Sequence, residues 1–298
     1  MKKIILTVFL TLSSFVYAAE TIKIYSPYSP GHSATSAMLK ILDKANVSQN
    51  TYKFVLEFKP GGNQIIAVRA LDASRSLAII APAFVENVAS GQLNEKDYVP
   101  VYALGDACWA VITNKSFKGQ KEFVVGGVGY GNAAHLTSLA LGEKYDFSVR
   151  YVIFKSNNDA LVNMAGDNGV EFVIDRYEAY ESLKTKNSKL NMVAASCPSR
   201  LPQAPSIPTL KELGINAPYI FNIIIAHKDM SESKRTAISK ILESATEEIG
   251  ETEIYKLSAV KPPQFSKVSA ADFYNISVST VRKLQNKYNA QIEQNRTQ

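Results

Sequence analysis

The sequence predicts an α/β protein with mostly parallel sheets in two lobes, and three observations support this prediction. Segments with strand-like patterns alternate along the chain with segments whose apolar residues have helical spacing. Two strand–glycine turn–helix units begin about 100 residues apart. Roughly the last 70 residues show only helical patterns. We expect them to pack on earlier elements, so that one lobe is discontinuous.

In the first half of the chain, hydrophobic spacing predicts strands and helices in turn. Thr21–Tyr25 reads as a strand, and a helix is expected to begin near Ser33 after a turn. Pro60-Gly61-Gly62 forms a second turn. The other expected elements are a helix at Ile65–Leu71 and strands at Tyr52–Phe58, Leu77–Ile80, Ala107–Thr113 and Glu122–Gly126.

In the second half, two polar residues are expected to cap helices. Asn132 stands before a helix that carries Leu136, and Ser231 before a later helix that buries Ile238. A last amphipathic helix is expected to bury Ile276 and Tyr288. The other expected strands are Arg150–Phe154, Gly169–Ile174, Leu190–Ala195 and Phe221–Ala226.

Composition excludes several classes of protein. The 298 residues are 46% apolar and 20% charged, which is ordinary globular composition and argues against disorder and coiled coil. With two cysteines in 298 residues, the chain is not a small disulfide-rich scaffold. No basic run or aromatic–basic pattern indicates nucleic-acid binding.

The N-terminus has the layout of a secretory signal peptide. Lys2 and Lys3 precede the apolar run Ile4–Val16, and small residues suit cleavage after Ala18. The run is too short to span a bilayer as a helix. We therefore expect export to the periplasm, with a mature chain whose net charge falls from +6 to +4. Export permits a disulfide between Cys108 and Cys197, but two separately buried thiols fit the sequence equally well.

Two glycine-containing loops are the best candidates for a binding site. Pro27–Ser33 and Gly126–Asn132 each lie between a strand and a helix N-terminus. Such places offer unpaired backbone N–H groups and the positive end of a helix dipole. Either loop alone reads more simply as a tight turn. Two such loops facing each other would clamp a carboxylate or phosphate.

Enzymatic alternatives have little support in the sequence. The second loop reads GxGxG, not the dinucleotide pattern GxGxxG, and no Walker-type Gly-Lys-Ser/Thr occurs. Neither GxSxG nor HExxH is present, and the three histidines lack metal-ligand spacing. Cys108, beside Trp109 and apolar residues, reads as a buried strand thiol. We therefore expect no enzyme, no catalytic residue, no cofactor and no metal.

Several motifs, in order, resemble those of one known family. The most extensive is Arg200–Gly214, in which Pro205, Pro208, Thr209, Glu212 and Gly214 match R-x-x-x-x-P-D-V-P-T-x-x-E-x-G. The chain thereby resembles the Bug-type periplasmic solute receptors of tripartite tricarboxylate transporters over about residues 20–275. The other matching segments are Pro27–Gly31, Pro60–Asn63, Lys96–Val101, Gly129–Leu136, Val152–Lys155, and Gly169–Glu171 with Asp175.

The resemblance implies a two-lobed, type 2 periplasmic-binding-protein (Venus-flytrap) fold. It implies residues 19–106 plus 222–298 in lobe 1 and residues 107–221 in lobe 2, after the signal peptide 1–18. It also implies a small organic carboxylate as ligand, membrane permease subunits as partners, and a monomer. The alternative is a ligand-binding input protein for a membrane sensor kinase.

The resemblance also implies which residues hold the ligand, mainly through main-chain N–H groups and hydroxyls. In the second lobe, Asp175 would select a polar or cationic substituent. His32 and Thr35 replace the usual second Gly and Asp of the family, so the cleft should favour anions, although His32 also fits a solvated turn residue. The expected contacts are Tyr28, Ser29, Gly31, His32, Ser33, Thr35, Gly127, Val128, Gly129, Gly131, Asn132 and Asp175.

Overall fold

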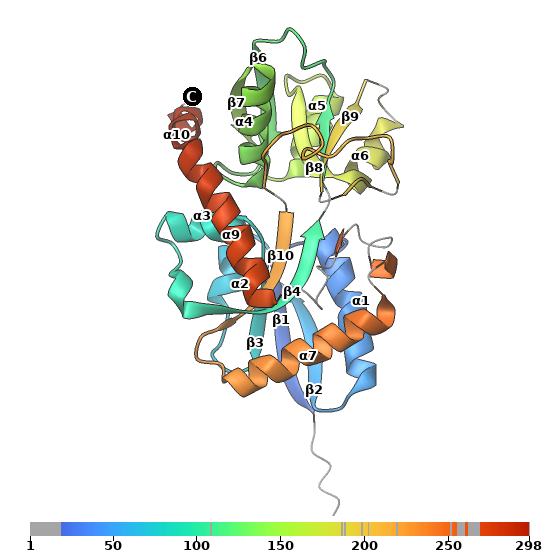
Figure 1. The fold of residues 1–298 in the computed structure, drawn as a ribbon, viewed down its shortest axis with the longest axis vertical. Coiled ribbons are helices and arrows are strands. Elements are labelled where there is room, and N and C mark those ends of the chain that lie inside the picture. Colours follow the sequence, from blue (N-terminus) through green and yellow to red (C-terminus); the bar gives the residue numbers. More distant parts are fainter. Residues whose placement is uncertain are drawn as a thin grey trace, which may run out of the picture.

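The protein consists of two stacked α/β lobes, each built on one sheet (Figure 1). The computed structural model describes residues 19–297, apart from 108, 186, 188, 198, 202, 219, 251, 255–259 and 262–268. The predicted signal peptide, residues 1–18, lies outside the described residues. Within the described ranges, no helix is both long enough and apolar enough to cross a membrane.

The first sheet, in the lower lobe of Figure 1, has the strand order β11-β4-β10-β3-β1-β2. β1 pairs in parallel with both β2 and β3, whereas β10 is antiparallel to β3 and β4. The strands are β1 (Glu20–Ser26), β2 (Tyr52–Phe58), β3 (Ser76–Ile80), β4 (Tyr98–Ala107), β10 (Ile220–His227) and β11 (Val260–Lys261).

The second sheet, in the upper lobe, has the order β7-β6-β8-β5-β9. β6 pairs in parallel with β7 and β8, and β5 is antiparallel to β8 and β9. Both sheets are therefore mixed: β10 and β11 run antiparallel to the other strands of the first sheet, and β5 runs antiparallel to the other strands of the second. The strands are β5 (Trp109–Thr113), β6 (Glu122–Gly127), β7 (Ser148–Ile153), β8 (Phe172–Arg176) and β9 (Asn191–Ser196).

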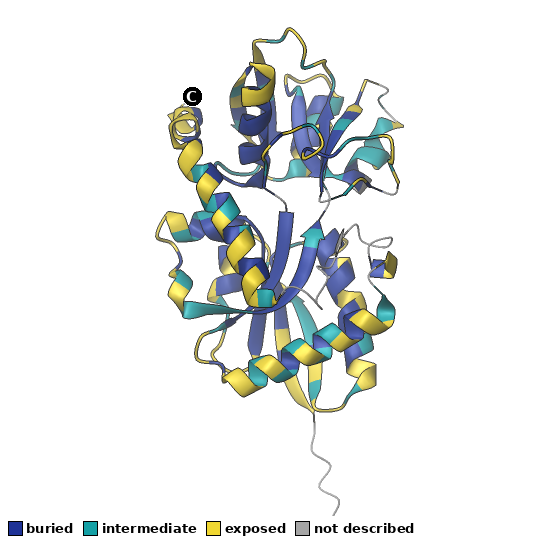
Figure 2. Cartoon of the chain, viewed as in Figure 1, coloured by how far each residue is buried: buried dark blue, intermediate teal, exposed yellow. Residues whose placement is uncertain are grey.

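Helices flank both sheets, and the strands between them are largely buried (Figure 2). On the first lobe, α1 and α7 pack against each other, and α7 also packs on β4. The helices described are α1 (Ser33–Ser48), α2 (Ile65–Arg69), α3 (Ala83–Ala89), α4 (Ala133–Tyr145), α5 (Asn157–Ala165), α6 (Tyr177–Lys184), α7 (Glu232–Ile249), α9 (Ala270–Lys287) and α10 (Asn289–Thr297), with short 3₁₀ turns at Gly62–Gln64 and Glu95–Asp97.

Most predicted elements are present, with a few corrections. The expected strand from Ala107 to Thr113 is divided, because β4 ends at Ala107 and β5 begins at Trp109 in the other sheet. Ser231 precedes α7 but its side chain accepts no capping hydrogen bond. The expected last helix is two helices, and Ile276 is 61% exposed because it faces away from the core.

The chain passes between the lobes at two adjacent points. It leaves the first sheet after Ala107 and enters the second at Trp109. It returns from β9 to β10, whose first residue, Ile220, pairs with Ala107. Because these two positions are hydrogen-bonded neighbours, the crossings lie side by side at the centre of the molecule.

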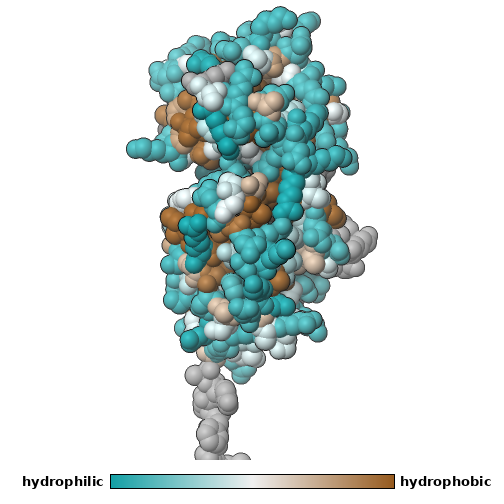
Figure 3. Space-filling view, turned by 90° about the vertical axis from the view of Figure 1, so that its left-hand side faces the viewer, coloured by the Kyte–Doolittle hydropathy of each residue, from teal (hydrophilic) through white to brown (hydrophobic). Residues whose placement is uncertain are grey.

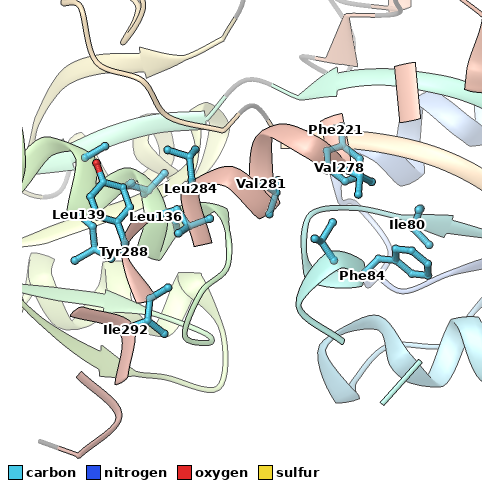
Figure 4. Close-up of a cluster of buried hydrophobic side chains, with 14 of the residues drawn as sticks. Ile80, Phe84, Leu136, Leu139, Phe221, Val278, Val281, Leu284, Tyr288 and Ile292 are labelled. Atoms are coloured by element: carbon cyan, nitrogen blue, oxygen red, sulfur yellow. The ribbon is translucent and has the colours of Figure 1, made fainter. Parts of the chain in front are cut away.

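Helices α9 and α10 connect the lobes a third time (Figure 1). At one end of α9, Val278 packs near Phe221 and Phe84 of the first lobe, and at the other end Leu284 lies near Leu136 of the second (Figure 4). α10 contacts β7, where the backbone N–H of Tyr151 donates to Asn295 Oδ1 at 2.7 Å. One continuous hydrophobic cluster therefore crosses from lobe to lobe under this helix pair.

Figure 3 shows the surface of the molecule from the left-hand side of Figure 1. There, hydrophobic surface gathers at the level where the lobes meet and just below it, bordered by hydrophilic surface. The predicted domain limits stay a prediction. Cys197 is disulfide-bonded, and Cys108, the other cysteine of the sequence, lies outside the described residues.

Candidate ligand-binding site

A cavity of about 480 Å³ lies between the two lobes. Its lining comes from the loops that follow the carboxyl ends of strands β1, β2, β3, β6 and β7, from the last two residues of β8, and from the first residues of β5 and β10. Parallel α/β sheets characteristically bind ligands at this edge. The lining residues are Pro27–Pro30, His32, Gly61–Gln64, Ala81–Ala83, Trp109, Val128, Asn132–Ala134, Lys155–Asn158, Asp175, Arg176 and Ile220.

The loop after β1 is fixed by its own side chains. The Tyr28 hydroxyl donates to Asn222 Oδ1 at 3.0 Å, and the Tyr28 ring stacks on the His32 imidazole. His32 Nδ1 in turn accepts the Ala34 N–H at 3.2 Å and so caps α1. These contacts hold the positive end of the α1 dipole at the cavity.

The loop after β6 presents a second helix N-terminus. Asn132 Oδ1 accepts the His135 N–H at 3.0 Å, which confirms the predicted cap of α4. The N–H groups of the first helical residues, Ala133 and Ala134, have no partner within a helix. Both residues line the cavity, so α4 directs its free N–H groups and its positive dipole end toward it.

The charged residues of the cavity are mainly cationic. Lys155 and Arg176 line it from the second lobe, and Asp175 is the one carboxylate among the described lining residues. Asp175 is buried, and its Oδ1 accepts the backbone N–H of Arg176 at 2.8 Å. The same oxygen lies 3.8 Å from Arg176 Nε. The negative charge of Asp175 is thus offset within the protein.

His32 is neutral at physiological pH. Burial, together with the positive charge of Arg176, lowers the pKa of His32 to about 3. The expected preference for anions therefore does not come from a charged His32. His135, a buried residue of α4, is also neutral, because burial lowers its pKa to about 3.

The structure brings half of the predicted contact residues to the cavity. Gly31 and Gly129 do not line it, and the Thr35 hydroxyl is buried against Ser26 Oγ at 3.1 Å. Ser33 is buried at the start of α1. The predicted residues that do line the cavity are Tyr28, Ser29, His32, Val128, Asn132 and Asp175.

Two glycines of the second loop serve the fold and do not line the cavity. A Cβ at Gly127 would lie 1.8 Å from the Tyr151 hydroxyl oxygen, so any other residue there would force Tyr151 to move. Gly131 has φ of 70°, and its N–H donates to His135 Nδ1 at 3.0 Å. Its carbonyl accepts from Gln285 Nε2 of α9 at 3.1 Å. The backbone N–H and carbonyl of Gly131 therefore both form hydrogen bonds within the protein.

The most extensive motif, near Arg200, also has a structural role. Arg200 Nε donates to the Glu212 carboxylate at 3.0 Å. That carboxylate accepts the Thr209 N–H at 2.7 Å, and Thr209 Oγ1 accepts the Glu212 N–H at 3.1 Å. These contacts therefore stabilise the segment around Thr209, which pairs with Ala195 of β9.

Sequence reasoning missed several residues of the cavity. The sequence identifies Trp109 only as a neighbour of Cys108, and it gives no sign that Arg176 belongs to a site. The two loops were selected because they follow the carboxyl ends of strands. Trp109 and Arg176 lie at the same edge of the second sheet, so the same criterion would have found both. The described residues contain no cluster of three or more His, Cys, Asp or Glu side chains that could hold a metal ion.

Solved structures that are similar to this chain include periplasmic solute-binding proteins. A TctC solute-binding protein from Polaromonas has a TM-score of 0.67 at 17% identity, covering 92% of this chain and 99% of that one. MatC from Rhodopseudomonas palustris with bound malate has a TM-score of 0.70 at 14% identity, covering 90% and 98%. The periplasmic binding protein BugD has a TM-score of 0.69 at 14% identity, covering 92% and 98%.

The chain has the fold of periplasmic solute-binding proteins. TctC and Bug proteins are the class that the motifs resemble, so the expected two-lobed α/β fold is confirmed. In this fold the cavity occupies the cleft between the lobes. No protein-family model matches the chain, and no curated protein matches it in sequence.

Proposed function

We propose that this protein is a periplasmic receptor of the tripartite tricarboxylate transporter type, which captures a small carboxylate between its lobes and delivers it to a membrane permease. The observation that carries the proposal is the convergence of two helix N-termini, those of α1 and α4, on one cavity between the lobes. The bound malate of MatC, a protein of the same fold, supports a carboxylate ligand.

The composition of the cavity favours an organic anion. Helix N-termini bind carboxylates and phosphates through free N–H groups and the dipole. Lys155 and Arg176 add two positive charges, and the one described carboxylate, Asp175, is already engaged with Arg176. The volume, about 480 Å³, lies within the range of small-molecule sites.

Six residues form our proposed contact set. Tyr28, Ser29 and His32 would hold the ligand from the first lobe, and Val128, Asn132 and the neighbourhood of Asp175 from the second. With ligand bound, the lobes would close by rotation at the crossings near Ala107 and Ile220. Closure is favoured only as far as the ligand binds the closed state more tightly. The permease would then recognise the closed form.

A thermal-shift titration of the mature protein, stripped of bound ligand, tests this proposal. The probes are mono-, di- and tricarboxylates, with neutral sugars and amino acids as controls. A ligand at about 100 times its Kd stabilises the folded state by roughly 2.7 kcal/mol, which is a shift of several degrees. A shift with carboxylates alone supports the proposal. Stabilisation by the neutral solutes, with none by carboxylates, overturns it.

A further inference from the structure

We propose that Gln285 of α9 is a positioning residue for the second loop, Gly126–Asn132, and that the helix pair α9–α10 couples this loop to the first lobe. The inference rests on the proposed function, because it concerns how the free N–H groups at the start of α4 are held in place. No described residue of the helix pair lines the cavity, so the pair acts on a ligand only through the loop.

The end of the second loop is held by α9. Gln285 Nε2 donates to the carbonyl oxygen of Gly131 at 3.1 Å. Because glycine has the least restricted backbone, the orientation of this peptide depends on its hydrogen bonds. Asn132, Ala133 and Ala134 follow directly in the chain, and all three line the cavity. The hydrogen bond from Gln285 therefore fixes the peptide immediately before the free N–H groups of α4.

The beginning and middle of the loop are held by α10. Asn295 is buried, and its Oδ1 accepts the backbone N–H of Tyr151 at 2.7 Å. The Tyr151 hydroxyl in turn lies against Gly127, where a Cβ would be only 1.8 Å from it. The guanidinium carbon of Arg296 lies 6.0 Å from the centroid of the Tyr130 ring, a cation–π contact. The helix pair thus supports the loop along its whole length.

The other end of α9 is attached to the first lobe (Figure 1). The Tyr274 hydroxyl donates to Glu95 Oε1 at 2.7 Å, and the Arg282 guanidinium forms an ion pair with Glu95 Oε2. Glu95 begins the 3₁₀ turn that leads into β4 of the first sheet. Arg282 stands three residues before Gln285, less than one turn of the helix away. A displacement of the first lobe at Glu95 is therefore transmitted through a rigid helix to the carbonyl of Gly131.

Hydrogen exchange of the ligand-free, mature protein tests the positioning role. The variants are Gln285→Leu, which loses the donor, and Gln285→Lys, which keeps one. Gln294→Leu, at an exposed residue of α10, is the matched control. We expect N–H exchange in residues 127–134 to rise about two- to tenfold in Gln285→Leu alone, as for the loss of one hydrogen bond. Exchange in β9, a strand of the same lobe, should stay unchanged in all three variants.

Two outcomes of this experiment overturn the positioning role. One is loop exchange in Gln285→Leu that equals that of wild type. The other is an equal rise in Gln285→Leu and Gln285→Lys, which would reduce the effect to packing. Circular dichroism confirms that each variant is folded.

Calorimetric titration then tests whether the loop position affects ligand affinity. The probe is whichever of malate, succinate and adipate stabilises wild type most. We expect Gln285→Leu to bind it about two- to tenfold more weakly, because the loop is less preorganised, and Gln285→Lys to bind it like wild type. Glu95→Ala should weaken binding by a smaller factor, although Glu95 lies outside the cavity lining.

The titration separates the coupling from the proposed function. An unchanged Kd in Glu95→Ala overturns the coupling of the loop to the first lobe. An unchanged Kd in Gln285→Leu overturns the role of this residue in binding, although the carboxylate receptor would then stand. A wild type that binds no carboxylate overturns the proposed function, whereas the hydrogen exchange of the ligand-free protein still decides whether Gln285 positions the loop.

Discussion

The phenol ring of Tyr28 and the imidazole ring of His32 lie parallel, with an interplanar angle of 1° and ring centroids 3.8 Å apart. On its other side the imidazole is fixed by the hydrogen bond from Ala34 to Nδ1. An imidazole that accepts a backbone N–H at Nδ1 and is buried against a phenol ring is stable in the neutral form. His32 therefore shapes the cleft and caps a helix without adding charge.

This neutrality predicts how stability depends on pH. The pKa values of His32 and His135 are lowered to about 3, against about 6.5 in an unfolded chain. The unfolded chain therefore takes up protons that the folded protein excludes. The free energy of unfolding should be highest above about pH 6.5 and fall as the pH is lowered toward 3. Melting temperatures of His32→Asn and His135→Asn between pH 4 and 7 should fall less steeply than those of wild type. Slopes equal to wild type would contradict the burial of neutral imidazoles.

Asn132→Ala should weaken both the fold and the binding of the ligand. The variant loses the acceptor for the His135 N–H, and a lost cap costs about 0.5–2 kcal/mol. It also loosens the start of α4, which lines the cavity. The control is Ser269→Ala, which removes the cap of α9 at Asp272, outside the lining of the cavity. Denaturation and ligand titration should show a similar loss of stability in both and a lower affinity only in Asn132→Ala. An unchanged Kd would remove Asn132 from the site.

Gly127→Ala should destabilise the second lobe. The new methyl group would overlap the Tyr151 hydroxyl, and overpacking of this kind costs about 1–3 kcal/mol. Gly129→Ala is the matched control two residues away, because the nearest atom to its Cβ would be at 3.5 Å. Urea denaturation should give a clearly lower midpoint for the first variant alone. Equal midpoints would mean that Tyr151 moves aside without cost.

Leu284→Ala and Ile276→Ala test the connection made by α9. Leu284 is buried between the helix and the second lobe, and a buried Leu→Ala change costs about 2–5 kcal/mol. Ile276 lies on the exposed face of the same helix, so its replacement should change stability by less than about 0.5 kcal/mol. Thermal unfolding distinguishes the two. Equal effects would contradict the packing of α9 across both lobes.

Local elements could be predicted from the sequence because their signals are local. The apolar spacing in α1 and the cap at Asn132 act within one or two turns of a helix, and both are confirmed. The sequence patterns do not predict strand β4 or the short helices α3, α5 and α6. The ten residues of β4 are buried along most of the strand, so they lack the alternation of a half-exposed strand.

The site could be predicted only in outline. Glycines before a helix predict both loops as binding loops, and residues of each loop line the cavity. The pairing of Trp109 with Arg176 joins residues 67 positions apart in an antiparallel ladder. Nothing in either segment specifies that register, because it depends on how β5 is inserted between β8 and β9. Likewise, Ile276 has helical spacing, but which face of α9 is buried depends on how that helix packs against the two lobes.

The place of β10 in the first sheet has a consequence for the order of folding. β10 lies between β3 and β4, yet it is separated from them by the whole second sheet in sequence. All strands of the second sheet lie within Trp109–Ser196, so that sheet can form from a continuous stretch of chain. The first sheet lacks its central strand until the residues after 220 arrive, and its long-range pairings close slowly. Folding should therefore begin in the second lobe, while β3 and β4, although translated earlier, acquire their shared neighbour β10 last.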